Sequence, residues 1–387
     1  MTERAVDLPS DGLLCLRVLG EVVGVRFAGP EPREQVRAAW SRCVVPTPRG
    51  RVRTIRSEQS DLPLTRPLSH RLAYDLTDLG IDLLSGRAVL LHAAGLSRPD
   101  GSVVALVAAS GTGKTTAAAR LARGGFGYVT DETVAVLEDG TVPPFPKPLS
   151  LVVDPDVEDD KVHVGPDQLG LAPCPERLHL AAVVLLERDP GLSGPPWLER
   201  LHPLEAVTQL VGHTSALTRL PRPLVSLAAL AADGAGVHRA HYSEAEDLEP
   251  LLHALLDAPS APTPPVPPVV LPVDLPVDLT DRSRMPSGRD PAERLGYVRA
   301  PVADGIRTRD GAVLLVGTDP VRLSPLGLTL WDAVEPVHDP AAGPVSLADV
   351  DDLVEAAERE HGPHPQAREL VGAALDALVA AGVLVRT

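Results

Sequence analysis

The sequence predicts an α/β fold, built as a sheet domain followed by a smaller α+β domain. Two observations predict it. Apolar runs typical of buried strands alternate with helical segments as far as Leu256, and beyond a proline-rich stretch the order changes to strands first and helices last. The length of 387 residues and the apolar content of 44% are enough for more than one core.

Residues 1–87 are expected to form a β-rich N-terminal extension. Leu13 to Phe27 alternates apolar and polar residues like a strand or hairpin, and Glu31 to Trp40 has a helical pattern. Leu72 to Leu84 reads as an amphipathic helix.

From Ala88 to Leu256 the pattern alternates strand and helix, which indicates a sheet with helices on its faces. The predicted helices are 114–123, closed by Gly124 and Gly125, and 247–256. The predicted strands are 88–93, 103–108, 128–137, 180–186 and 237–241.

A linker is expected over residues 257–290. Its first part, Asp257 to Leu279, is so rich in proline that it excludes helix and favours an extended, polyproline-like spacer. The domain boundaries are therefore placed at 1–256 and 291–387.

Residues 291–387 have the proportions of a winged-helix α+β domain. Strands are expected over 294–300, 311–317 and 320–323. Ser324 is expected to cap a short helix that has Pro325 at its first position. Ser346 and Asp349 are expected to form the capping box of a second helix. The last predicted helix, 367–381, stops at Gly382.

Charge and composition exclude several classes of protein. A net charge of −16 repels phosphate backbones, so nucleic acid is not an expected partner. The three cysteines, Cys15, Cys43 and Cys174, fit neither a disulfide framework nor a zinc site. The first twelve residues lack the apolar stretch of a signal peptide, and no apolar run approaches the roughly 20 residues of a membrane span. We expect a cytoplasmic protein without a membrane partner.

A glycine-rich segment between a predicted strand and a predicted helix matches a Walker A loop. It reads AASGTGKT from Ala108 to Thr115, with alanine where the first glycine is usual. The backbone N–H groups of such a loop surround phosphate oxygens, its lysine reaches the β- and γ-phosphates, and its hydroxyl ligates Mg²⁺. These last roles fall to Lys114 and Thr115. We expect ATP or another nucleoside triphosphate, with Mg²⁺, on Ser110, Gly111, Thr112, Gly113, Lys114, Thr115 and Thr116.

Phosphoryl transfer also needs a carboxylate on the metal side and a group that takes the proton of the acceptor. Asp131 and Glu132, near a predicted strand, are the candidates. Adjacent residues on a strand face opposite ways, so the two act together only if the backbone bends or Mg²⁺ bridges them. We expect one to ligate Mg²⁺, directly or through water, and the other to accept the proton.

Structural alternatives stand beside these interpretations. The glycine-rich turn can be one that binds no nucleotide, or binds it without turnover, and the acid pair can be an exposed turn. A histidine beside a buried strand, such as His92, is more often a core residue than a catalyst. Only Lys114, Lys147 and Lys161 are lysines among 36 basic residues, and one of them stands where the Walker A mechanism needs it.

The stretch from Leu90 to Ser150 resembles the catalytic core of bacterial HPr kinase/phosphorylases, which are P-loop proteins. That family has a histidine at a strand end, a Walker A loop, and a glycine-initiated strand that ends in paired acids. Here these are His92, the loop ending at Thr115, and Gly127 to Glu132. The resemblance implies an HPr-kinase-like domain over residues 1–256, with His92, Asp131 and Glu132 catalytic. It implies that Asp131 is the base, that Glu132 joins Thr115 at the metal, and that several copies assemble.

The sequence departs from this family after the acid pair. The family's glycine-rich signature for its HPr partner is not recognisable, and PPFPKPLSL, with Lys147 and Ser150, occupies the region. HPr is therefore not the expected substrate. Lys147 is expected either to contact phosphate or to face solvent.

Residues 291–387 resemble PqqD-like domains, the recognition elements of pathways for ribosomally made and post-translationally modified peptides (RiPPs). The resemblance lies in the segment DGAVLLVGTDPVRLSPLGLTLWDAV, the two helices after it and GVLV. It implies that a leader peptide binds as an added strand along the third strand and packs against the last helix. The residues it assigns to this groove are Val321, Arg322, Leu323, Val371, Ala374 and Leu378.

A winged domain can also bind DNA, but charge argues against it here. Residues 291–387 hold eight arginines, no lysines and fifteen acidic residues, a net charge of −7. The expected function is thus in RiPP biosynthesis, where a captured precursor would be phosphorylated on Ser or Thr. The alternatives are a non-catalytic recognition protein that delivers the precursor to other pathway enzymes, and a kinase for a small molecule.

Overall fold

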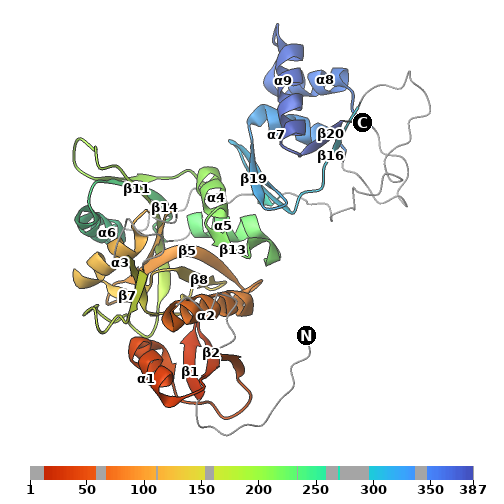
Figure 1. Cartoon of the computed structure of the whole chain (residues 1–387). Coiled ribbons are helices and arrows are strands. Elements are labelled where there is room, and N and C mark those ends of the chain that lie inside the picture. Colours follow the sequence, from red (N-terminus) through yellow and green to blue (C-terminus); the bar gives the residue numbers. More distant parts are fainter. Residues whose placement is uncertain are drawn as a thin grey trace. The chain divides into compact units, whose positions relative to one another are not determined.

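The computed structural model describes residues 13–57, 67–109, 112–152, 161–232, 234–258, 269–270, 296–335 and 347–386. Within these ranges the chain is a mixed α/β structure with several sheets and nine α-helices (Figure 1). None of those helices has both the length and the apolar character needed to cross a membrane. The contacts divide the chain into unit 1, residues 1–201, 213–220 and 233–261, and unit 2, residues 202–212, 221–232 and 262–387.

The N-terminal part of unit 1 is a four-stranded sheet in the order β3-β1-β2-β4, which confirms the predicted hairpin. The hairpin turns at Leu19 and Gly20, with φ of 48° and 91°, and positive φ at both turn residues suits the twist of paired strands. Two helices pack with this sheet around the buried Trp40. The elements are β1 (Leu13–Val18), β2 (Glu21–Arg26), α1 (Pro30–Ala39), β3 (Val44–Val45), β4 (Arg53–Arg56) and α2 (Leu68–Leu84).

The central sheet of unit 1 has the order β12-β14-β11-β6-β5-β13, with β7 and β8 also paired to β5. β6, β11 and β14 run parallel, whereas β5 and β12 are antiparallel to their neighbours. The strands are β5 (Ala88–Ser97), β6 (Ser102–Val107), β7 (Gly127–Thr130), β8 (Thr133–Leu137), β11 (His179–Arg188), β12 (Trp197–Arg200), β13 (Thr214–Ser215) and β14 (Val237–Tyr242). A separate hairpin consists of β9 (Leu149–Val152) and β10 (Lys161–Val164).

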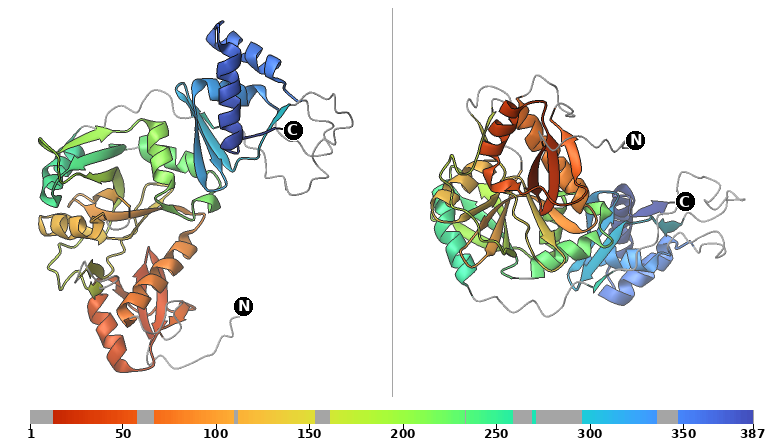
Figure 2. Two further views of the ribbon diagram at one scale, coloured as in Figure 1. Left: turned by 45° about the horizontal axis from the view of Figure 1, so that its top comes forward. Right: turned by 90° about the horizontal axis from the view of Figure 1, so that it is seen from below.

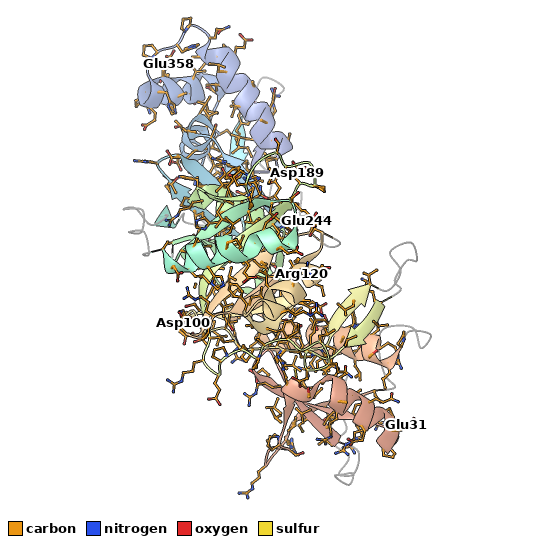
Figure 3. All side chains as sticks on the ribbon, turned by 90° about the vertical axis from the view of Figure 1, so that its left-hand side faces the viewer. Glu31, Asp100, Arg120, Asp189, Glu244 and Glu358 are labelled. Carbon is orange, nitrogen blue, oxygen red and sulfur yellow. The ribbon has the colours of Figure 1, made fainter. Side chains whose placement is uncertain are left out.

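Helices α3 (Lys114–Arg123) and α6 (Leu248–Asp257) cover this sheet (Figure 1). The buried face of α3 consists mainly of alanines, whose small side chains let the helix lie close to β5. On its outer face Arg120, labelled in Figure 3, forms an ion pair with Glu246 in the turn before α6. Both helices match the predicted ranges to within a residue.

The predicted strand Tyr128 to Leu137 is two strands. β7 ends at Thr130 and β8 begins at Thr133, and both pair with β5. The backbone leaves the ladder at Asp131 and Glu132, where the N–H of Ala93 still donates to the carbonyl of Glu132 at 3.2 Å. The backbone therefore bends at Asp131 and Glu132, as it must if the two acids are to act together.

Unit 2 contains a sheet in the order β15-β17-β18-β19 and a pair β16-β20. Its strands are β15 (Val269–Val270), β16 (Tyr297–Arg299), β17 (Asp304–Thr308), β18 (Gly311–Val316), β19 (Asp319–Leu323) and β20 (Leu384–Arg386). Its helices are α4 (Pro203–Val211), α5 (Pro223–Ala232), α7 (Pro325–Ala333), α8 (Val350–His361) and α9 (Ala367–Ala380). β17 was not predicted, and two valines of the expected linker pair with it as β15.

Both faces of β18 are covered (Figure 2). Ala312 and Leu314 belong to the core formed with α7, α8 and α9. Val313 and Leu315 are fully buried outside that core, on the face that α4 and α5 contact. The contacts thus group α4 and α5 with unit 2, although the sequence places them before the linker.

The helix ends in unit 2 follow capping chemistry. The hydroxyl of Ser324 accepts a hydrogen bond from the N–H of Gly327 at 3.1 Å, which confirms the predicted cap. The next helix is capped by Asp349 with Asp352, and the predicted partner Ser346 lies outside the described residues. The last helix stops where predicted, since Gly382 takes a φ of 72°.

Candidate functional site

The predicted phosphate-binding loop connects the end of β6 to the start of α3. Gly113 precedes the helix with a φ of 93°, and a Cβ there would meet nothing within 4 Å. Among the described residues no side chain caps the first turn of α3, so its N–H groups are available to an anion. Ser110 and Gly111 lie outside the described residues.

Lys114 folds back over this loop. Its Nζ donates to the carbonyl oxygens of Ala108 at 2.5 Å and Ala109 at 3.2 Å. Burial lowers the pKa of this lysine, and the charges of Asp131 and Glu132 oppose that shift. Both contacting groups are neutral, so the ammonium keeps a charge that a phosphate would neutralise.

Three threonines flank Lys114. Thr112 is exposed and its hydroxyl donates to the Ala109 carbonyl at 2.7 Å. Thr115 is half-buried and Thr116 exposed, both in the first turn of α3. Thr115, directly after Lys114, is the position at which the Walker A pattern has the hydroxyl that ligates Mg²⁺.

Lys147 joins the two acids. Its buried Nζ lies 2.9 Å from Asp131 Oδ1 and 2.9 Å from Glu132 Oε2, and it also donates to the Pro148 carbonyl at 3.3 Å. Burial alone would lower the pKa of Lys147, but the two carboxylates raise it above its ordinary value. Burial acts to raise the pKa of Glu132, but the charge of Lys147 prevails and lowers it. Lys147 therefore does not face solvent. It also cannot bind a phosphate as long as it is paired with both Asp131 and Glu132.

Tyr128 completes this network. Its buried hydroxyl lies 3.0 Å from Asp131 Oδ1, to which it donates, and 3.1 Å from the Lys147 carbonyl oxygen. Burial, followed by the charge of Asp131, raises the pKa of the Tyr128 phenol well above its usual range. The phenol is therefore a fixed donor that orients Asp131.

The side chains of Asp131 and Glu132 differ in their exposure to solvent. The side chain of Asp131 is 2% exposed, whereas that of Glu132 is 39% exposed. Mg²⁺ in phosphoryl-transfer sites commonly uses one or two carboxylates together with substrate phosphates. Glu132 is the more exposed of the two acids, and the described residues contain no group of three or more His, Cys, Asp or Glu side chains that could hold a metal ion.

His92 is exposed, although it sits on the largely buried strand β5. Its backbone N–H donates to the His213 carbonyl at 2.7 Å, and its charge helps to lower the pKa of Glu132. Burial and the charges of Lys114 and His92 lower the pKa of His213. The charges of Asp131 and Glu132 thus act on Lys114, and that of His92 acts on Glu132.

The predicted peptide groove is only partly at the surface. Leu323, Val371 and Leu378 are buried in the core of unit 2, while Val321 and Ala374 are partly buried and Arg322 is exposed. Leu370, which the prediction omitted, exposes 47% of its surface on α9. Within the described residues β19 pairs only with β18, so its other edge carries unpaired backbone groups.

Sequence reasoning missed Tyr128 and the buried position of Lys147. One signal was available for Lys147, because the chain has only three lysines. Two of the three lysines belong to this site: Lys114 at the loop and Lys147 between the acids.

No protein-family model matches the chain, and no curated protein does. Among solved structures, the chain is similar to the HPr(Ser) kinase/phosphatase from Coxiella burnetii at 12% sequence identity. That similarity covers 43% of this chain and 88% of the other, with a TM-score of 0.24. A TM-score this low does not show a shared fold. The proposed function therefore depends on the residues of the site itself.

Proposed function

We propose that this protein is an ATP-dependent kinase of a RiPP pathway that phosphorylates a Ser or Thr of a precursor peptide. The observation that carries the proposal is the convergence of Lys114, at a Walker A loop, with the acid pair Asp131 and Glu132. The charges of both acids act on Lys114. A cation for phosphate, a metal ligand and a proton acceptor are the groups that phosphoryl transfer requires.

ATP and Mg²⁺ would supply the transferable phosphoryl group and neutralise its charge. The N–H groups at the start of α3 and the ammonium of Lys114 would hold the phosphates, and Thr115 with Glu132 would hold the metal ion. Asp131 is the proposed proton acceptor, with its Oδ1 fixed by Lys147 and Tyr128. His92, exposed beside Glu132, would contact the acceptor or the transferred group.

The edge of β19 is the proposed peptide site in unit 2. An extended leader peptide would add to this edge through main-chain hydrogen bonds at Val321 and Arg322. Its apolar side chains would contact α9 near Ala374 and Leu370, which reach the surface. The remaining residues assigned to this groove would support it from the core.

Binding of the leader would raise the local concentration of the acceptor at the P-loop unit of the same chain. The kinase site then needs few contacts of its own with the residue that it modifies. The same PqqD-like recognition mode would allow other pathway enzymes to share the peptide, and the HPr-kinase-like resemblance makes a homo-oligomer part of the proposal.

The test uses the full chain, the precursor peptide encoded beside its gene, Mg²⁺ and γ-labelled ATP. The proposal is supported if the precursor becomes labelled, if Lys114→Ala abolishes the label, and if Arg123→Ala keeps it. Arg123 lies at the exposed C-terminal end of α3. Arg123→Ala is a matched control because it removes a cation from the same helix. An intact precursor that binds and stays unlabelled contradicts it.

One observation favours a second candidate, a non-catalytic recognition protein that delivers the precursor to separate enzymes. Lys147 contacts both carboxylates, so neither is free of an ion pair. This candidate predicts that Lys114→Ala changes neither leader binding nor modification of the precursor by the other pathway enzymes.

A further inference from the structure

A serine and a histidine face each other across the β9-β10 hairpin, next to the candidate site. Ser150 and His163 are directly opposite in the antiparallel register, and Ser150 Oγ lies 2.8 Å from His163 Nε2. Neither residue has a role in the function proposed above. The contact joins a nucleophilic hydroxyl to a nitrogen that can take its proton.

The hairpin contacts the helix that follows the nucleotide loop, and the charges of Lys147 and Glu132 act on His163. β9 contacts α3, the helix that starts at Lys114, and Leu149 lies in the same core as the alanines of α3. Because side chains alternate along a strand, Ser150 points away from that core. Lys147, three residues earlier, holds the acid pair.

The ring of His163 is neutral, so one of its nitrogens can accept a proton. Its Nδ1 is buried and has no hydrogen-bond partner among the described residues. Burial, together with the charges of Lys147, His70 and Lys161, lowers the pKa of His163 to about 4, so the ring is neutral at pH 7. The charge of Glu132 acts in the opposite direction and would stabilise the imidazolium once it forms.

The same surroundings suit a phosphorylated serine. Lys147 and Lys161 are close enough for their charges to act on His163, and the ring of His70 lies 5.2 Å from that of His163 in an edge-on contact. The charge of Lys161 would offset part of the charge of a phosphate on Ser150, while Lys147 remains paired with Asp131 and Glu132.

We propose that Ser150 is a self-phosphorylation site of this protein, with His163 as the base that takes its proton. The inference rests on the proposed binding of ATP at Lys114 of the same chain. The bond from Ser150 Oγ to the γ-phosphorus forms as the bond from that phosphorus to the β,γ-bridging oxygen breaks. ADP leaves with the electron pair, and the hydroxyl proton passes to His163 Nε2.

The test is intact-mass analysis of the full chain after incubation with Mg-ATP and no peptide, followed by mapping of the modified residue. We expect one phosphate, on Ser150, that is absent from Ser150→Ala and from Lys114→Ala. His163→Asn should slow its formation by up to about 10²-fold, the lower end of the usual contribution of a general base, because a pKa of about 4 makes His163 a weak base at pH 7; the affinity for Mg-ATP should be unchanged. That unchanged affinity shows that the variant still folds.

A second Ser–His contact in unit 1 provides the matched control. Ser102 Oγ lies 3.4 Å from His179 Nε2, where β6 and β11 begin. Ser102→Ala and His179→Asn should leave the phosphate on Ser150 and its rate unchanged. A rate that falls equally in His179→Asn and His163→Asn would overturn the role of His163.

The outcomes separate this inference from the function on which it rests. A chain that binds Mg-ATP but gains no phosphate, or gains it at another residue, overturns the inference and leaves the proposed kinase intact. A folded chain that binds no Mg-ATP overturns both. Phosphate on Lys114→Ala, when that variant is mixed with Ser150→Ala, would show transfer between chains and overturn transfer within one chain.

Discussion

The ammonium of Lys147 lies 2.9 Å from Oδ1 of Asp131, and both side chains are 2% exposed. The same ammonium lies 2.9 Å from Glu132 Oε2, so one buried cation holds two adjacent carboxylates. Without it, the bend between β7 and β8 would bring two like charges together in a poorly solvated place. Lys147 is therefore the residue that makes the acid pair compatible with the fold.

Replacement of Lys147 should destabilise unit 1 strongly. Lys147→Met removes the partner of a buried carboxylate, and breaking a buried ion pair in this way costs about 3–5 kcal/mol. The measurement is urea unfolding followed by the change in tryptophan fluorescence.

Two variants control that experiment. Lys161→Met removes an exposed lysine from β10 of the same unit and should shift the unfolding midpoint little. Lys147→Met combined with Asp131→Asn should recover part of the loss, because the uncompensated charge is then gone. A Lys147→Met protein as stable as the wild type would contradict the buried ion pairs.

Stability should fall as the pH drops from 6.5 towards 4, in part because of His163. Its pKa is about 4 in the folded chain against an ordinary value of 6.5, so in this window the unfolded chain binds the extra proton. Stability gained from the neutral ring is complete above pH 6.5 and is lost below it. His163→Asn should reduce the slope of unfolding free energy against pH by at most about 1.4 kcal/mol per pH unit.

His238 gives this measurement an internal reference. Burial lowers its pKa to about 4 as well, so its share of the slope should remain in His163→Asn and vanish in His238→Asn. Equal slopes for wild type and His163→Asn would show that His163 is as accessible to protons in the folded chain as in the unfolded one.

Asp304 should be essential to the way α5 packs in unit 2. This fully buried carboxylate accepts from Leu224 N–H at 2.8 Å and from Gly305 N–H at 2.9 Å, and lies 3.0 Å from Arg222 Nε. Asp304→Ala leaves those donors without their acceptor and should cost about 3 kcal/mol.

Amide hydrogen exchange of residues 223–232 should accelerate in Asp304→Ala. Asp319→Ala, on the exposed start of β19, should leave it unchanged. Protection of α5 that survives Asp304→Ala would contradict this role.

Leader binding should depend on the space between β19 and α9. Ala374→Arg places a long charged side chain at this partly buried position and should weaken binding at least tenfold, because apolar contact with the peptide is replaced by steric conflict. Fluorescence anisotropy with labelled leader peptide measures the change. Glu358→Arg on α8, labelled in Figure 3, makes a larger change of charge on a helix that contributes no residue to the assigned groove, and should have little effect. Equal affinities of the two variants would place the peptide elsewhere.

Local signals predicted most of the elements. The helix after Lys114 was predicted with its bounds, because an apolar period of 3.6 residues ends at Gly124 and Gly125. β17 was missed because Asp304–Thr308 has no apolar alternation of its own, and it becomes a strand by pairing with β18. The contact of α4 and α5 with the strands of unit 2 depends on residues far apart in the chain, such as Leu224 and Asp304, and has no local signature.

The candidate site was predictable where a short motif carries it. The Walker A pattern located Lys114, and the requirement for a bend at Asp131 and Glu132 is met. Lys147 lies in a proline-rich loop, a context that usually exposes lysine, and only tertiary folding buries it between the acids. The contact between Ser150 and His163 needs the β9-β10 register, which composition does not encode.

The central claim is that the backbone and Lys114 at the start of α3 hold the phosphates of a nucleotide. Isothermal titration calorimetry of the full chain with Mg-ATP tests it most directly. We expect saturable binding to one site per chain, at least 100-fold weaker in Lys114→Ala and unchanged in Arg123→Ala. A folded wild-type chain that releases or absorbs no heat with Mg-ATP at several temperatures, or binds it equally well in Lys114→Ala, would contradict the claim.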